Sequence, residues 1–222
     1  MVDGISVIER YSMLVSVVNL KCSNCGEPLS ESITRCPSCD QPVVIKKISS
    51  LLGLTQSELY ARSRLMDSEG VKNQGTLYAD TNYTAGCCLL RLKMYDQAIL
   101  RFGKVIEISP CNADVFFSMA IADLKGLRPF LAPLVNVRKA LENLARATMI
   151  EDRAVFHYFL AYIKFDFYAR RFLRIDPNWQ YEFRNALTLG LTTEEANELF
   201  DVLEKECPEE LEILDSPCVV SR

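Results

Sequence analysis

The chain has 222 residues, of which 49% are hydrophobic, and a formal net charge of -4. This size predicts one folded domain with a small additional module, and the acidic balance argues against a protein built mainly to bind phosphate backbones. No stretch reaches the roughly 18 to 20 apolar residues of a transmembrane helix. Asp3 and Glu9 lie where a secretory signal would carry positive charge. We therefore expect a cytoplasmic protein with no membrane partner.

The N-terminal part contains two short segments that favour β-strands. Residues 12–21 include the β-branched Val15, Val17 and Val18, and residues 43–45 form a second short apolar run. Two pairs of cysteines lie between these segments. We expect residues 1–48 to form one small module in which the strands hold the two cysteine pairs together.

The cysteine pairs carry the most specific motif of the sequence. They are Cys22 with Cys25, and Cys36 with Cys39. Two residues between the cysteines of a pair let the chain turn so that both thiolates face one ion, and two such turns complete a tetrahedral site. Gly26 supplies a positive φ after the first pair, and Asp40 can adopt a similar conformation after the second. The pattern predicts a structural Zn2+ ion in a zinc ribbon.

Two other readings of this motif stay open. Iron in a rubredoxin-like site shares the tetrahedral thiolate geometry, and two metal-free redox pairs share the spacing. The remaining five cysteines are interpreted as small buried hydrophobic residues or as thiols without a role. They are Cys87, Cys88, Cys111, Cys207 and Cys218.

Residues 49–76 are predicted to be a linker followed by a capping helix. Thr55 and Glu58 have the spacing of a capping box, which opens a helix that continues to about Met66. Gly70 and Gly75 interrupt the helical pattern and indicate a loop.

Residues 79–112 span the 34-residue period of tetratricopeptide (TPR) repeats. The residues that match the family's pattern are Gly86, Tyr95, Ala98, Phe102 and Pro110. Small residues let two antiparallel helices approach, Phe102 fills the space between them, and Pro110 ends the second helix. Asn82 lies where the family usually has a large aromatic residue, and Val105 replaces the usual alanine.

A second repeat begins at Ala113, and residues 126–133 interrupt it as an insertion. An aromatic-rich helix over residues 151–172 follows and is expected to be buried between neighbouring repeats. Two more helices follow, and the last is capped by Thr192 and Glu195. The predicted fold is mainly α: a TPR-like domain over residues 77–208, followed by an acidic tail over residues 209–222.

The chain resembles bacterial proteins in which an N-terminal zinc ribbon precedes TPR-like repeats. This resemblance implies a groove that binds a peptide along the inner face of each first helix. The side chains assigned to that groove are Tyr83, Cys87, Leu90, Arg91, Phe117, Ile121, Leu124 and Lys125. Tyr83 and Cys87 replace the lysine and asparagine with which some relatives clamp a carboxylate. We expect a mainly apolar peptide, with an acidic group near Arg91 or Lys125.

Other charged and reactive residues give weaker signals. His157 is expected to be a packed or partly exposed helix residue. The alternative is a catalytic pair in which Cys87 or Cys88 is the nucleophile and His157 the base.

A basic cluster lies at the end of the same helix and consists of Lys164, Arg170, Arg171 and Arg174. We interpret it as a solvated helix end, with an anion or acidic-peptide site as the alternative. Residues 191–215 contain ten acidic residues and one lysine, and are interpreted as a solvated acidic helix and tail.

Together these patterns predict a non-enzymatic protein-interaction scaffold or adaptor with one structural zinc site. Its partner would be a protein or a peptide. The alternative is a zinc-ribbon nucleic-acid-binding regulator, for which Arg35, Lys46 and Lys47 are the candidate phosphate contacts.

Overall fold

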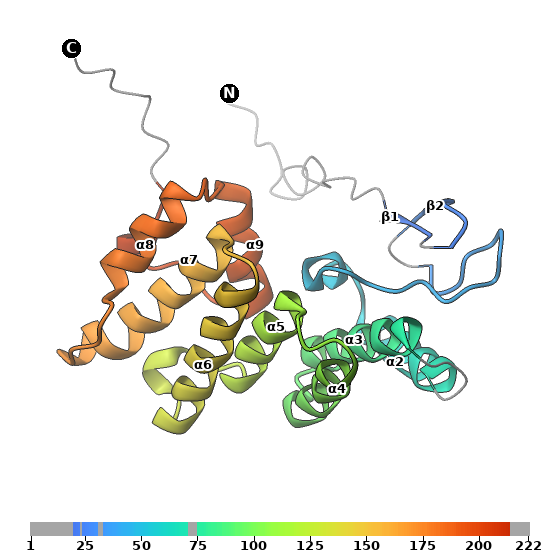
Figure 1. Cartoon of the computed structure of the whole chain (residues 1–222), viewed down its shortest axis with the longest axis horizontal. Coiled ribbons are helices and arrows are strands. Elements are labelled where there is room, and N and C mark those ends of the chain that lie inside the picture. Colours follow the sequence, from blue (N-terminus) through green and yellow to red (C-terminus); the bar gives the residue numbers. More distant parts are fainter. Residues whose placement is uncertain (1–19, 23, 31–32, 71–74, 214–222) are drawn as a thin grey trace, which may run out of the picture. The chain divides into compact units, whose positions relative to one another are not determined.

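The structure is a computed structural model that describes residues 20–22, 24–30, 33–70 and 75–213 (Figure 1). The chain divides into two compact units, Met1–Val43, here called the cysteine unit, and Val44–Arg222, here called the helical unit. The division falls before the predicted module boundary at residue 48, because residues 44–48 pack with the helices. Each unit is described by itself below.

The cysteine unit is built from local pairings. Strand β1 (Leu20–Lys21) pairs antiparallel with strand β2 (Pro28–Leu29), and Arg35 forms a single bridge with Pro42. Most of the strand predicted over residues 12–21 lies outside the described residues. The strand predicted over residues 43–45 is wrong: this segment is irregular, and the Ile45 N–H donates to the side chain of Thr84 instead of to a neighbouring strand.

The helical unit confirms the prediction of a mainly α chain. The α-helices of the described residues are α2 (Gln56–Gly70), α3 (Thr76–Arg91), α4 (Tyr95–Ile108), α5 (Ala113–Asp123), α6 (Leu134–Ile150), α7 (Ala154–Ile163), α8 (Trp179–Thr188) and α9 (Thr193–Leu203). Shorter turns are η1 (Ile48–Leu51), η2 (Pro129–Leu131), the π-helix η3 (Lys164–Tyr168), η4 (Ala169–Arg171) and η5 (Glu209–Leu211). From α2 to α8, each helix packs against the next one along the chain, whereas α9 packs against α7 and η1 (Figure 1). None of the helices described is both long and apolar enough to cross a membrane.

Both predicted capping boxes are present. The backbone N–H of Thr55 donates to the Glu58 carboxylate at 2.8 Å, and the Glu58 N–H donates back to the Thr55 hydroxyl. Thr192 and Glu195 make the same reciprocal pair at the start of α9. These bonds satisfy backbone donors that a helix N-terminus otherwise leaves unpaired.

The α3–α4 hairpin has the close approach that the repeat pattern predicts. A Cβ atom on Gly86 of α3 would lie 2.5 Å from Cε1 of Phe102 on α4, and the Phe102 ring is fully buried. Only hydrogen at position 86 leaves room for that ring, so this glycine is required by packing rather than by its backbone conformation.

The insertion between α5 and α6 is held by a buried carboxylate of η3, the π-helix that follows α7. Asp166 of η3 accepts a hydrogen bond from the backbone N–H of Phe130 at 2.8 Å and forms an ion pair with Arg128 at 2.6 Å. Asp166 is itself fully buried, and a buried carboxylate requires such partners. Residues 126–133 therefore provide donors for Asp166, an arrangement that the sequence pattern did not reveal.

Most of the aromatic helix is buried as predicted. Phe156, Phe159, Tyr162, Phe165 and Phe167 are buried and Tyr168 is partly buried, whereas Phe172, at the end of η4, is 96% exposed. The predicted solvated cluster also differs at one member. Lys164 is buried and forms an ion pair with Glu182 of α8, so it helps to join α7 to α8.

The start of the predicted acidic tail belongs to the helical core. Leu211 is fully buried, and the Tyr158 hydroxyl donates to its carbonyl oxygen at 2.8 Å. Residues 209–213 thus close the helical unit instead of leaving it. Residues 214–222 of the predicted tail lie outside the described residues.

Candidate functional site

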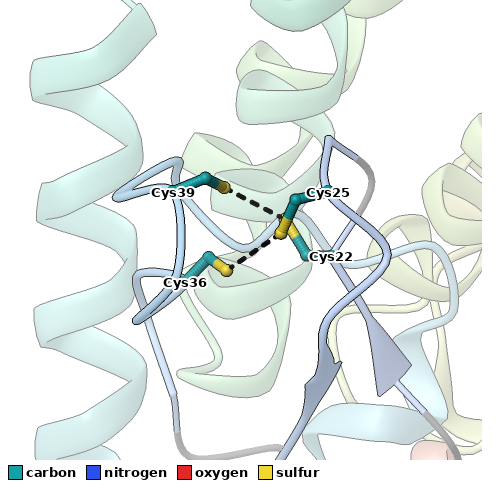
Figure 2. Close-up of side chains that lie close together, drawn as sticks. All are labelled: Cys22, Cys25, Cys36 and Cys39. Atoms are coloured by element: carbon teal, nitrogen blue, oxygen red, sulfur yellow. Dashed lines mark hydrogen bonds between the residues drawn. The ribbon is translucent and has the colours of Figure 1, made fainter.

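The four cysteines of the cysteine unit meet at one point. All four sulfur atoms lie within 4.8 Å of one another, and Figure 2 shows the side chains converging. The Cys22 and Cys39 sulfurs are 3.6 Å apart, and the Cys25 and Cys36 sulfurs are 3.5 Å apart. Sulfurs at about 2.3 Å from a tetrahedral ion would be about 3.8 Å apart. The cluster therefore has the dimensions of a four-thiolate metal site.

Two equivalent turns place these sulfurs. The Cys22 N–H donates to the Glu27 carbonyl and the Gly26 N–H donates to the Cys22 carbonyl. In the second turn the Cys36 N–H donates to Gln41 and the Asp40 N–H donates to Cys36, with the same residue offsets.

The conformations expected after the two cysteine pairs are also present. Gly26 has a φ of 79° and Asp40 a φ of 56°, both in the left-handed region. These positions turn the chain sharply, so that both sulfurs of each pair face the same point. Asp40 is further held by Arg35, which donates to its carbonyl oxygen at 2.9 Å.

The thiols perturb one another and are perturbed by nearby N–H groups. The backbone N–H groups of Cys25 and Asn24 lower the pKa of Cys22 to about 6. The N–H of Glu27 acts in the same direction on Cys25, but the Cys36 thiol and burial outweigh it and raise the Cys25 pKa to about 12. Without a cation, four sulfurs at this spacing cannot all ionise easily, whereas a divalent ion would stabilise all four thiolates.

The predicted groove side chains lie on one face of α3 and α5, but most of them are covered. Tyr83, Cys87, Leu90, Ile121 and Leu124 are buried, Arg91 and Phe117 are partly buried, and Lys125 is exposed. A first-helix face that binds a peptide must have accessible side chains. Most of this face is instead part of the protein's own core.

The chain itself provides part of that cover. The Ile45 N–H donates to the Thr84 hydroxyl of α3 at 2.9 Å, and the side chains of Ile45, Ile48 and Leu51 are buried in the same cluster as Tyr83. Helix η1 contacts both α3 and α9. The segment of residues 44–52 thus lies against the inner face that the TPR resemblance assigned to a ligand.

The two groove cations already have partners. Arg91 contacts the Glu204 carboxylate at 3.3 Å, and Lys125 contacts Asp96 at 2.9 Å. An acidic ligand group at either position would have to compete with these carboxylates.

A hollow of about 260 Å³ in the helical unit is lined by five predicted groove residues, namely Leu90, Arg91, Ile121, Leu124 and Lys125, whose two cations carry the ion pairs described above. A second hollow, called the hollow below, lies beside the other two lining groove residues, Tyr83 and Phe117. Its walls come from η1, α3, α5, α7 and α9, and it is a cavity of about 70 Å³. Tyr83, Phe117, Val155 and Leu199 contribute apolar surface. The charged lining residues are Lys47, Asp114, Arg153, Glu195 and Glu198. Sequence reasoning missed the residues from α7 and α9, because those helices lie beyond the recognisable repeats.

His157 belongs to a charged network rather than to a pair with a cysteine. Its Nδ1 lies 2.7 Å from the Glu182 carboxylate and its Nε2 lies 2.8 Å from Asp152. The hydrogen bond to Glu182 is the main cause of a raised His157 pKa, which favours the charged imidazolium. Burial raises the pKa of Cys88 to about 12 and that of Cys87 further. A base and a thiol in these states are poorly suited to nucleophilic catalysis.

Comparison of the chain with protein-family models, with curated proteins and with solved structures finds no match. The geometry of the cysteine cluster and of the hollow therefore carries the functional argument.

Proposed function

We propose that the cysteine cluster holds one structural Zn2+ ion in a zinc-ribbon module. The supporting observation is the pair of equivalent turns that bring four sulfurs to tetrahedral spacing. Four protein thiolates leave no open coordination position, so the ion would stabilise the fold rather than activate water. Elemental analysis of protein expressed with both zinc and iron supplied tests the identity: one zinc per chain supports the proposal, and one iron per chain overturns it.

For the helical unit we propose a protein-interaction role, with TPR-like hairpins that present the hollow to a peptide. The observation that carries this proposal is that the hollow is lined both by apolar side chains and by charged ones, the latter here called the rim. Such a combination is typical of sites that bind one anchoring side chain and orient it with a few polar groups. A volume of about 70 Å³ corresponds to about five waters, which suits a single side chain.

The rim charges favour a ligand that carries a basic group. Arg153 is paired with Asp114 at 2.7 Å, which leaves Lys47 against Glu195 and Glu198. The rim therefore has one negative charge in excess. We propose that the preferred peptide has an apolar anchor next to a lysine or arginine, in contrast to the acidic group expected from the sequence.

Selection of a random peptide display library on the full, metal-loaded chain tests this role. Peptides that enrich should combine an apolar anchor with a basic residue. Glu198→Lys reverses an exposed rim charge and should weaken them about tenfold, since charged hydrogen bonds contribute about 1.5 to 3 kcal/mol. Glu194→Lys makes the same change on α9 outside the hollow and serves as the matched control.

Two results would contradict the interaction role at this site. One is a selection in which no peptide enriches, and the other is enriched peptides whose affinity is unchanged by Glu198→Lys. The alternative of a nucleic-acid-binding regulator predicts instead a mobility shift that weakens steeply with salt and does not depend on Glu198.

A further inference from the structure

The end of α7 and the insertion between α5 and α6 form a surface of unusual composition. Residues 124–141 and residues 167–175 contain seven arginines and lysines and no acidic residue, in a chain whose net charge is -4. The basic residues are Lys125, Arg128, Arg138, Lys139, Arg170, Arg171 and Arg174. These two segments are therefore a local excess of positive charge on an otherwise acidic protein.

The two segments lie next to each other. The Arg171 side chain donates to the Phe130 carbonyl and stacks between the rings of Phe130 and Phe167, at 4.8 and 4.3 Å from their centroids. Asp166, from the same helix end, accepts hydrogen bonds from Arg128 and from the Phe130 N–H of the insertion. Asp166 offsets part of the positive charge, since it pairs with Arg128 and lies 3.5 Å from Arg170, and Asp96 pairs with Lys125. The positive charge that these carboxylates do not offset is that of Arg138, Lys139, Arg171 and Arg174.

Large apolar side chains protrude from this basic surface. Phe172 is 96% exposed and Leu131 is 65% exposed, while Leu127 and Leu173 are about half exposed. Isolated exposed leucines are ordinary on a protein surface, but a group of them among arginines marks an interaction site. We call Phe172, Leu131, Arg171 and Arg174 the protruding patch.

Phe172 occupies a position at which phenylalanine is unfavourable. The Phe172 N–H donates to the Ala169 carbonyl and the Leu173 N–H donates to the Tyr168 carbonyl, which closes the helix with Phe172 in the left-handed conformation at a φ of 56°. Glycine or asparagine is preferred at this position, and a bulky residue there is strained. Neither burial nor backbone preference explains this side chain, so a role in binding is the remaining physical reason for it.

We propose that the protruding patch inserts into the surface of a membrane that contains anionic lipids. Phe172 is almost fully exposed, so the protein provides no wall against which a docked peptide could enclose it. A bilayer interface would surround the ring and the leucines, and the arginines would contact lipid phosphates. The expectation of no membrane partner rested on the lack of a transmembrane stretch, which does not bear on contact with one leaflet.

Sedimentation with vesicles tests the proposal on the full, metal-loaded chain. The protein should bind vesicles of phosphatidylcholine with phosphatidylserine at about 0.1 M salt, where surface charge still acts over about 10 Å. Binding to vesicles of phosphatidylcholine alone should be weaker by at least about tenfold, because each basic residue strengthens binding to anionic lipid about fivefold. The single tryptophan, Trp179, lines a hollow with Leu173 and Arg174, so its fluorescence should shift on binding.

Two variants separate binding from folding. Phe172→Asn should lower the partition coefficient about tenfold, since a phenylalanine side chain leaves the bilayer. It should leave the melting temperature unchanged or raise it, because asparagine tolerates the left-handed conformation. Arg174→Glu changes the charge by two and should lower binding to anionic vesicles about 25-fold.

The control combines Leu100→Asn and Lys104→Glu on α4, where Leu100 is 69% exposed. It removes one exposed apolar and one basic side chain elsewhere and should bind as the wild type does. The proposal is overturned if the wild type does not sediment with anionic vesicles, or if the control loses as much binding as Phe172→Asn. It is also overturned if the patch instead binds a polyglutamate peptide or mediates dimerisation in light scattering.

Discussion

The two units of this chain are stabilised in different ways. The buried apolar cluster of the cysteine unit comprises Cys22, Leu29, Cys36 and Val43, two of which are candidate metal ligands. The helical unit has a continuous core that extends from Ile45 to Leu211. Units below about 40 residues rarely fold on a hydrophobic core alone. The comparison teaches that a metal ion held by the four cysteines, as proposed above, should be essential for the first unit and dispensable for the second.

Removing a metal ligand should give the largest effect and break the comparison most clearly. Cys36→Ser leaves three thiolates and should abolish stable metal binding. The cysteine unit should then unfold, because it loses the coupled free energy of binding and folding, which is about 10 to 16 kcal/mol for structural zinc. Metal content and limited proteolysis should show an unfolded cysteine unit with an intact helical unit. Cys111→Ser, at an exposed cysteine of the helical unit, should retain the metal.

Filling the contact between α3 and α4 should give the next largest effect, in the other unit. Gly86→Ala places a methyl group about where Phe102 lies and should lower the free energy of unfolding by about 1 to 3 kcal/mol. Gly103→Ala on α4 meets no atom within 4 Å and should raise it by about 0.5 to 1 kcal/mol. Chemical denaturation measures both. Equal effects of the two changes would contradict the packing account of Gly86.

The network around His157 predicts a pH-dependent contribution to the helical unit. Its pKa is raised from 6.5, so its stabilisation is fully present below 6.5 and is lost as the pH rises through the folded-state value. Hydrogen bonds from His157 and Lys164 outweigh burial and lower the Glu182 pKa, so that contribution is instead lost in acid as the pH falls through the Glu182 pKa.

Replacing the histidine isolates its own contribution. His157→Gln should cost about 1 to 3 kcal/mol at about pH 6 and less at about pH 8, as measured by denaturation at both values. Met149→Gln, at a side chain that is 86% exposed, should show no such dependence. A cost that grows with pH would reverse the assigned sign.

A surface ion pair should give the smallest effect. Glu204 contacts Lys93 at 2.7 Å and Arg91 at 3.3 Å, and it is partly exposed. Glu204→Gln should lower the free energy of unfolding by less than about 1 kcal/mol, and high salt should remove the difference. A larger loss of unfolding free energy that persists in high salt would contradict this account. It would show that Arg91 behaves as a buried charge that requires the Glu204 carboxylate.

The sequence predicted those features that depend on short-range chemistry. The cysteine spacing, the positive φ at Asp40 and the Thr192 capping box are fixed by neighbours within five residues, and all three are present. The contact of Gly86 with Phe102 was predictable because a known repeat spacing links the two positions. The identity of the metal and the repeat family stay predictions.

Features that depend on distant residues were not predictable. Nothing near Ile45 indicates that its segment lies against α3, and nothing near Asp166 indicates that its partners come from the insertion. The residues assigned to the groove lie on one face of α3 and α5, but the sequence gave no sign that residues 44–52 pack against that face. Phe172 was grouped with the buried aromatics because periodicity does not show where a helix ends.

The most direct test of the difference between the two units is removal of the metal while each unit is observed separately. Proton–nitrogen NMR spectra of the full chain should be recorded before and after addition of a strong chelator. We expect the amide signals of Cys22, Cys36 and their neighbours to collapse to unfolded positions, while those of α3 to α9 stay dispersed. Loss of the helical signals together with the cysteine signals would contradict the claim that the metal stabilises only the cysteine unit.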